Sequence, residues 1–109
     1  MYAIPMPDKR LKQIEKRIEK IKAALAEHEP MRPGSLTRQY KDPENKKGAY
    51  FQLSYTRDMR SRTDYIPSDG VPEVRRLVGN YKRFKSLTTE WVDLSIEHSR
   101  LKIRQAREG

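Results

Sequence analysis

The 109-residue sequence contains no cysteine. This absence excludes a disulfide framework, a thiol nucleophile, a thiolate zinc site and an iron–sulfur cluster. Only two histidines are present, His28 and His98, and neither has a second histidine or acidic residue three or four positions further along the chain. We therefore expect no metal site and no cofactor.

Long hydrophobic runs are also missing. No apolar stretch approaches the roughly 20 residues that a membrane-spanning helix needs. The short apolar segment Met1 to Pro7 is followed by charge instead of being preceded by it, which is unlike a signal peptide. We therefore expect a cytoplasmic protein without a membrane segment.

Signatures of catalysis are absent as well. The sequence has no glycine-rich phosphate loop, no recognisable Ser–His–acid set and no paired-carboxylate pattern. A chain of 109 residues fits one domain and leaves no room for a two-domain enzyme. We expect a single non-enzymatic domain over residues 1–109.

Positive charge is abundant. Lys and Arg number 24 against 15 Asp and Glu, which gives a net charge of +9. Charged residues (36%) slightly outnumber hydrophobic ones (35%), so the core is thin. Such a chain is marginally stable unless a partner covers more of its surface, and polyanions are the first partners to consider.

Residues 8–29 are predicted to form a long helix. Pro7 and Asp8 suit its start, and Pro30 ends it. Apolar side chains recur at the three- and four-residue spacing of a coiled coil: Leu11, Ile14, Ile18, Ile21 and Leu25. Ile18 is the centre of this stripe and is expected to be buried.

Residues 34–67 are predicted to form a three-stranded antiparallel meander. Its central strand shows period-two alternation, with four apolar positions: Ala49, Phe51, Leu53 and Tyr55. Residues 35–40 and 61–66 supply the other strands, because a lone hairpin is marginal in water. Residues 41–48 form a loop, and residues 57–60 form a hairpin loop that lacks the glycine favouring a primed turn.

Residues 71–105 are predicted to continue as helix, with Ser68 or Asp69 capping its start and Pro72 in its first turn. Gly79 and the polar residues Ser86, Thr88 and Thr89 weaken the middle, so one bent helix and two helices are alternatives. The stripe comprises Val74, Leu77, Tyr81, Phe84, Leu87, Trp91, Leu94, His98 and Leu101.

The predicted fold class is therefore α+β, with a long N-terminal helix, a three-stranded antiparallel sheet and a long C-terminal helix. One small sheet cannot cover two apolar helix stripes. We expect the helices to pack in a coiled-coil-like manner, within the chain, across a homo-oligomer, or both.

Four segments resemble a family of small uncharacterised prokaryotic proteins that are often found near transposases and other mobile elements: Gly34–Leu36, Gly48–Tyr55, Arg62–Pro67 and Val74–Phe84. The resemblance covers residues 34–85 and implies a mobile-element setting. Many relatives carry cysteines after the first strand, where this chain has Lys41 to Lys47, so no metal role transfers. The strand–turn–strand also resembles arm-type integrase DNA-binding domains, although Asp58-Met59-Arg60 replaces their usual Gly-Lys at the turn.

The polar face of the sheet is predicted to contact nucleic acid, with double-stranded DNA as the expected partner. Gln, Ser and Arg hydrogen-bond base edges, and a β-ribbon fits the roughly 12 Å major groove. The candidate base-contacting residues are Gln52, Ser54, Arg60 and Arg62, and the candidate phosphate contacts are Arg38, Lys46, Lys47, Arg57, Arg75 and Arg76. A merely solvated sheet face is the competing interpretation. An aromatic platform for single strands is another, formed by Tyr50, Phe51, Tyr55 and Tyr65.

The sequence leaves two possible functions open, one in nucleic-acid binding and one in protein binding. The first is a non-enzymatic DNA-binding accessory protein of a mobile element, dimeric through its helices. The second is a helical adaptor or inhibitor that binds a protein such as a transposase or nuclease. Arginines gathered on one sheet face with Lys46 and Lys47 favour the first, and an exposed apolar helix stripe favours the second.

Overall fold

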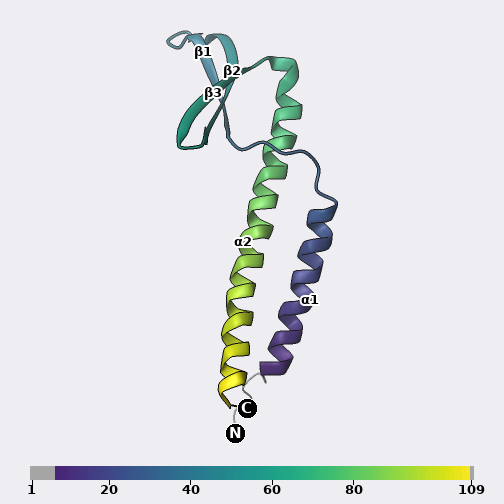
Figure 1. The fold of residues 1–109 in the computed structure, drawn as a ribbon. Coiled ribbons are helices and arrows are strands. Elements are labelled where there is room, and N and C mark those ends of the chain that lie inside the picture. The colour runs from purple at the N-terminus through teal and green to yellow at the C-terminus, as the bar shows by residue number, and fades with distance from the viewer. Residues whose placement is uncertain (1–6, 109) are drawn as a thin grey trace. The chain divides into compact units, whose positions relative to one another are not determined.

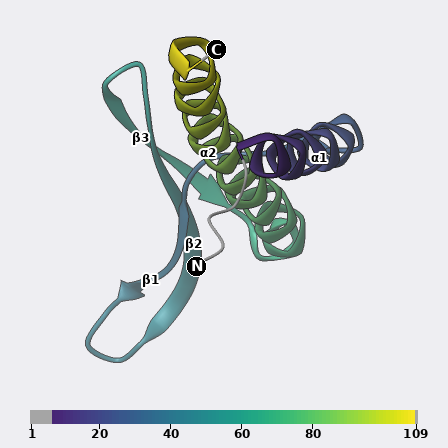
Figure 2. The same cartoon turned by 90° about the horizontal axis from the view of Figure 1, so that it is seen from below.

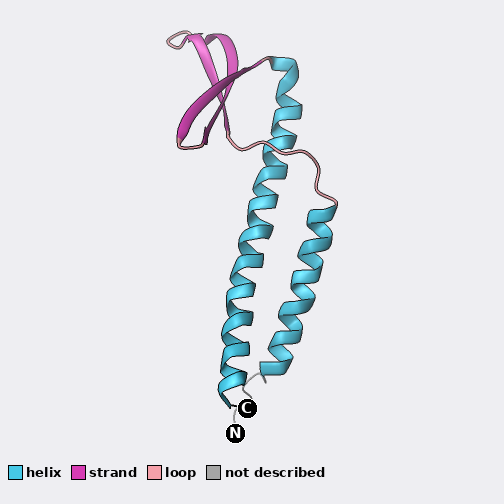
Figure 3. Cartoon of the chain, in the orientation of Figure 1, coloured by secondary structure: helices cyan, strands magenta, loops and turns pink. Residues whose placement is uncertain are grey.

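The computed structural model describes residues 7–108 and contains the predicted α+β elements in the predicted order (Figure 1, Figure 3). Helix α1 spans Pro7–Ala26, and helix α2 spans Val71–Glu108. Strands β1 (Ser35–Asp42), β2 (Lys47–Arg57) and β3 (Arg60–Ile66) form an antiparallel sheet in the order β1-β2-β3. The interpretation of Met1 to Pro7 concerns residues that, apart from Pro7, lie outside the described range.

The chain divides into two units. A helical unit comprises Met1–His28 and Phe84–Gly109, and a sheet unit comprises Glu29–Arg83. Helix α2 contributes its first turns to the sheet unit and its remainder to the helical unit. None of the helices within residues 7–108 is long and apolar enough to cross a membrane.

Arginine–glutamate pairs hold one side of the seam between α1 and the later part of α2. Arg10 donates two hydrogen bonds to the carboxylate of Glu97, at 2.6 and 2.8 Å. Arg17 donates two to Glu90, at 2.6 and 2.7 Å. From Arg10 to Arg17 the chain advances seven residues along α1, while their partners, Glu97 and Glu90, lie seven residues apart in the reverse direction along α2. This heptad correspondence is that of an antiparallel coiled coil, and it confirms the predicted packing of the helices.

The opposite side of the seam repeats with the same period. Its three contacts, again seven residues apart, join Asp8 to Gln105 (2.5 Å), Glu15 to His98 (2.9 Å) and the ammonium of Lys22 to the ring of Trp91 (5.7 Å to the centroid). Ile14 and Ile21 lie between the two sides and are fully buried. The seam therefore has an apolar interior and polar borders along its length.

Ile18 differs from the prediction because it is only half-buried. It lines a shallow groove beside Ser95 and Ser99 of α2. These short polar side chains are too small to cover the isoleucine, so the centre of the predicted stripe is not the centre of the core.

The helix ends also differ in detail from the sequence interpretation. Helix α1 ends at Ala26 and not at Glu29. The His28 N–H donates to the carbonyl of Leu25 (3.0 Å) in a tighter last turn. Glu29 precedes Pro30, and the helical conformation is unfavourable for a residue that precedes proline. Helix α2 is a single element from Val71 to Glu108, so the polar stretch does not divide it. The Thr88 hydroxyl in this stretch donates back to the Phe84 carbonyl at 2.9 Å.

A short 3-10 turn, Ser68–Gly70, precedes α2. The Gly70 N–H donates to the Pro67 carbonyl at 2.9 Å. Ser68 and Asp69, which were expected to cap the helix, form this turn instead, and its start at Pro67 has no side-chain cap.

The core of the sheet unit lies between one face of the sheet and the first turns of α2. Leu53 is fully buried and clusters with Ile66, Val71, Val74 and Val78. We call the sheet surface that carries Leu53 the inner face and the opposite surface the outer face. Because side chains alternate along a strand, the inner face also carries Leu36, Arg38, Phe51, Tyr55, Arg57, Arg60, Arg62 and Asp64.

The segment between α1 and β1 is tied to α2 within the sheet unit. The buried Asn80 amide donates to the Pro30 carbonyl at 2.9 Å. The Arg32 N–H donates to the Leu77 carbonyl at 3.1 Å. These two bonds fix the backbone of residues 30–32 on the helix.

Truncating Ile14 should destabilise the protein more than truncating Ile18. Ile14→Ala removes fully buried surface and leaves a cavity, at a cost of about 2–4 kcal/mol, whereas the half-buried Ile18 should lose less than half as much when changed to Ala. Thermal melts followed by circular dichroism compare the two, because each kcal/mol shifts the midpoint by about 4–8 °C in a domain of ~100 residues. Equal losses would contradict the burial difference.

Acid should weaken the fold through the seam. The hydrogen bonds from Arg17 and Arg10 lower the pKa of Glu90 and Glu97 in the folded state. A lowered folded pKa stabilises the protein above the unfolded value of about 4.3, and this contribution is lost as the pH falls through the folded pKa. Urea unfolding at a series of pH values between 6 and 3 should show this loss. The Glu90→Gln/Glu97→Gln variant should show a shallower one, and an unchanged pH slope would contradict the assignment.

Candidate nucleic-acid interface

Three arginines gather on the inner face next to the β2–β3 turn, and we call them the arginine end. Arg57 lies directly opposite Arg60 in the strand pairing, and Arg62 lies opposite Tyr55. All three arginines are exposed, and no ion pair involves them among residues 7–108. Like charges directly opposite each other destabilise a strand pair. The sheet therefore carries a concentrated positive charge here, and within the described residues no acidic side chain, including that of Asp58 in the turn, forms an ion pair with it.

The turn beside the arginine end has a strained backbone. Asp58 and Met59 form a two-residue loop, with φ values of 53° and 61°. Two positive φ angles are typical of a type I′ hairpin turn, where Asn-Gly or Asp-Gly is usual. A methionine in this conformation costs about 1–2 kcal/mol, yet its side chain is 97% exposed. Strain of this kind at an exposed tip is a pointer to function.

The acidic residue closest in sequence to Arg62 is already engaged. Arg32 donates to the carboxylate of Asp64 at 2.5 Å, and its guanidinium lies over the ring of Tyr55 at 5.1 Å. Sequence reasoning missed Arg32, because it precedes the sheet in a segment without periodicity. Its pairing leaves the arginine end without an acidic partner from β3.

Lysines and one further arginine lie toward the other end of the sheet. Lys46 is in the β1–β2 turn with φ 52°, and Lys47 begins β2. Arg38 lies on the inner face, with its guanidinium 5.3 Å from the centre of the Phe51 ring. The two turns lie at opposite ends of the sheet (Figure 2), and a strand rise of about 3.3 Å per residue separates Lys47 from Arg57 by about 33 Å.

Gln52 and Ser54 are not neighbours of Arg60 and Arg62, so the predicted base-reading surface is wrong. Gln52 pairs with Tyr65, and Ser54 pairs with Thr63, all on the outer face. A two-residue turn pairs even-numbered residues of β2 with odd-numbered residues of β3. The even-numbered arginines of β3 therefore share the inner face with the odd-numbered residues of β2.

The outer face is polar but nearly uncharged. Lys41 is its one charged member, beside Ser35, Thr37, Gln39, Tyr50, Gln52, Ser54, Thr56, Ser61, Thr63 and Tyr65. The Tyr50 and Tyr65 rings are 6.2 Å apart, whereas Phe51 and Tyr55 belong to the inner face. The four aromatic residues therefore do not form one stacking platform.

Arg75 and Arg76 differ in availability on the first turns of α2. Arg76 bonds Glu73 at 2.6 and 3.0 Å and also bonds Glu29, and the hydrogen bond to Glu73 raises the pKa of Arg76. A guanidinium held by two carboxylates is a poor phosphate contact. Arg75 is exposed, and no ion pair of its own occurs within the described residues.

The sheet unit carries an excess of positive charge. Residues 29–83 include twelve Lys and Arg against seven Asp and Glu. Across the described part of the chain, no group of three or more His, Asp or Glu residues could hold a metal ion. The arginine end and the lysines of the opposite turn are thus the strongest candidates for contact with an anionic polymer.

Comparison with known proteins identifies the family. No curated protein and no solved structure matches the chain. The family described as Domain of unknown function (DUF6788) matches residues 8–76, which cover nearly all of helix α1, the whole sheet and the first turns of α2. This match extends over more than half of the sequence, and the chain therefore belongs to the DUF6788 family.

Proposed function

We propose that the protein binds double-stranded DNA through the arginine end of its sheet. The observation that carries this proposal is the direct opposition of Arg57 and Arg60, with Arg62 two residues further along the same face. Bound phosphates would remove the repulsion between these side chains, so the arrangement is more favourable with a polyanion than without one.

The shape of the β2–β3 hairpin supports the same proposal. A two-stranded ribbon fits the major groove of DNA, which is about 12 Å wide. The exposed Met59 stands at the tip between Arg57 and Arg60. Apolar side chains of this kind make contacts with bases, and some groove-binding proteins insert them between base steps.

Lys46 and Lys47 supply a second contact point. Their separation from the arginine end, about 33 Å along β2, is close to one turn of B-form DNA, about 34 Å. Both ends can therefore approach phosphates of one duplex. Gln52 and Ser54 on the outer face have no part in this contact.

The proposed role is non-enzymatic and cytoplasmic. The idea that the protein is an accessory of a mobile element rests on the resemblance of residues 34–85 alone, and it stays a prediction. A protein partner is the second candidate function, and the observation that favours it is an exposed apolar stripe on α2.

Charge-matched double variants test the DNA contact. Arg60→Ala/Arg62→Ala should weaken duplex binding more than tenfold and reduce discrimination between sequences, because base contacts of arginine are each worth about 1–3 kcal/mol. Lys46→Ala/Lys47→Ala should weaken binding to all sequences alike and lower the salt slope by about two. Fluorescence anisotropy with labelled duplexes at two salt concentrations measures both.

The control for this experiment is Lys12→Ala/Lys20→Ala on α1. Both lysines are exposed and lie outside the sheet unit. Every double variant takes the net charge from +9 to +7. Equal losses in all three variants would point to bulk electrostatics and refute the sheet as the binding surface.

Replacing Met59 by glycine should separate stability from binding. Met59→Gly relieves the positive φ angle and should stabilise the protein by about 1 kcal/mol. It leaves the charge unchanged and removes the apolar tip, so DNA affinity should fall several-fold. A melting curve and an anisotropy titration of one preparation measure the two effects. Unchanged affinity would exclude Met59 from the contact.

A further inference from the structure

The later part of α2 carries a second apolar stripe. The side chains of Val92, Ile96 and Ile103 are 58%, 46% and 59% exposed. With Ser99 and Ala106 they follow spacings of four, three, four and three residues, which is the pattern of a coiled-coil seam. Helix α1 packs on another side of α2 and reaches only the edge of this stripe, at Ser99. Within the described residues of the helical unit, Val92, Ile96 and Ile103 therefore stay exposed.

The stripe is accompanied by a shallow groove. Val92 and Ile96 line it together with Trp91, while its remaining wall consists mainly of small polar residues. Small side chains at such positions allow another helix to approach closely. The surface therefore leaves room for another helix to pack closely on α2.

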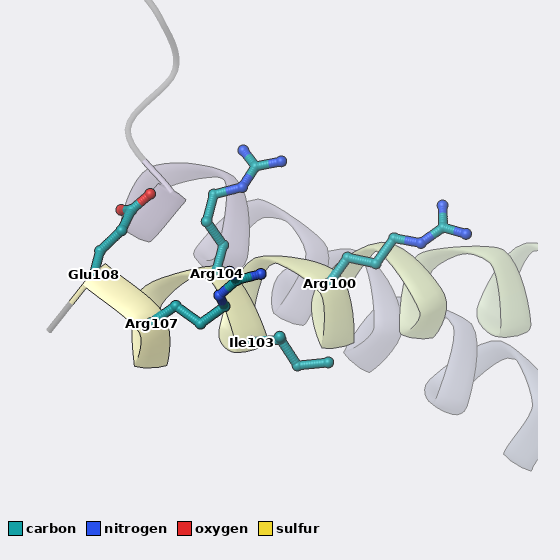
Figure 4. Close-up of a pocket in the computed structure, with 5 residues that line it drawn as sticks. All are labelled: Arg100, Ile103, Arg104, Arg107 and Glu108. Carbon is teal, nitrogen blue, oxygen red and sulfur yellow. The ribbon is translucent and has the colours of Figure 1, made fainter.

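A charged stripe runs beside the apolar one and changes sign along its length. Its first half is acidic, with Glu90, Asp93 and Glu97, and its second half is basic, with Arg100, Arg104 and Arg107. Figure 4 shows these three arginines projecting from the last turns of α2 around Ile103. None of them forms an ion pair among residues 7–108, and Arg100 and Arg104 repel each other at a spacing of four.

A stripe that is acidic in one half and basic in the other is complementary to itself when two copies run antiparallel. With a two-fold axis between residues 98 and 99, Asp93 comes opposite Arg104 of the partner subunit. The same register brings Ile96 between Ser99 of the partner subunit and Ile103 of the partner subunit. Charge and apolar packing thus agree on one register.

A parallel arrangement lacks this agreement. It places Arg100 opposite Arg100 of the partner subunit and Asp93 opposite Asp93 of the partner subunit, which brings like charges together. Glu90 and Glu97 already bond Arg17 and Arg10 within the chain. Asp93 and Arg104 are therefore the residues most available to form ion pairs between two copies of the chain.

We propose that a second copy of this chain docks antiparallel on the stripe Val92–Ile96–Ile103, so that two helical units form a four-helix bundle with two-fold symmetry. Dimerisation was expected from the sequence for another reason, namely that two helix stripes lacked cover. The stripe of α1 and the later part of the α2 stripe cover each other within the chain, while Val74 packs in the core of the sheet unit. The interface assigned here is therefore a further one. It is independent of DNA binding through the sheet.

Single cysteines test the register, since the natural chain has none. In the proposed dimer Ser99 lies beside Ser99 of the partner subunit, so Ser99→Cys should form a disulfide-linked dimer under mild oxidation. Ser86→Cys, also exposed on α2, lies far from the axis and should stay uncross-linked. Equal cross-linking of both variants would overturn the antiparallel register.

A charge exchange tests the pairing. Asp93→Arg and Arg104→Asp should each weaken dimerisation more than tenfold in analytical ultracentrifugation, because each creates two like-charge contacts. The double variant should restore the dimer, because it recreates both pairs with opposite sign. Circular dichroism confirms that each variant is folded.

The outcomes separate the alternatives. A natural chain that is monomeric at micromolar concentration, and whose Ser99→Cys variant does not cross-link, would overturn the dimer. A dimer that both single variants leave intact would overturn this interface. The DNA titrations on Arg60 and Arg62 are read independently, because neither Asp93 nor Arg104 belongs to the sheet unit.

Discussion

The seven-residue correspondence between α1 and the later part of α2 is the constraint on which the helical unit depends. The Arg17–Glu90 and Arg10–Glu97 pairs are partly exposed to solvent, and exposed pairs contribute little net stability. Their effect is to select one register and one direction of α1 on α2. The free energy comes from burial of Ile14 and its apolar neighbours between the two borders. Once this register is set, one side of α2 is occupied, and its opposite side is left for another partner.

The sheet unit depends on a comparable geometric constraint, the length of one turn. Because the β2–β3 turn has two residues, Arg57 faces Arg60, and the arginines share a surface with the core residue Leu53. The first turns of α2 cover the middle of that surface, while the arginines lie beyond it at the turn. The result is a cationic surface at the end of the inner face, with the polar outer face nearly uncharged.

The elements of the fold were predictable because their signals are local. The apolar spacing of residues 11–25 and the alternation of residues 49–55 each identify an element without knowledge of what it contacts. The burial of Ile18 was not predictable in the same way, since it depends on the small Ser95 that α2 places against it. The end of α1 was misplaced by three residues because the tight turn at His28 leaves no pattern in the sequence.

The candidate site was only partly predictable. The sequence indicates correctly that Arg60 and Arg62 share a face, because they have the same parity. Their neighbours depend on the strand register, which the length of the β2–β3 turn sets and which the alternation of side chains within one strand does not reveal. Arg32 reaches the sheet only because a backbone bond fixes it on α2, which no local pattern reports. The second stripe of α2 was hidden by the stronger stripe on its other side.

Two stripes on one helix limit how the length of α2 can change. Each residue turns the helix by 100°, so one inserted residue between Leu87 and Trp91 would rotate everything after it. Trp91 and His98 would leave the seam with α1, and Val92 and Ile103 would leave their own face. Seven residues is the shortest insertion or deletion that keeps both stripes nearly in phase, with a drift of about 20°. The later part of α2 therefore tolerates substitutions on its charged border more readily than any change in its length.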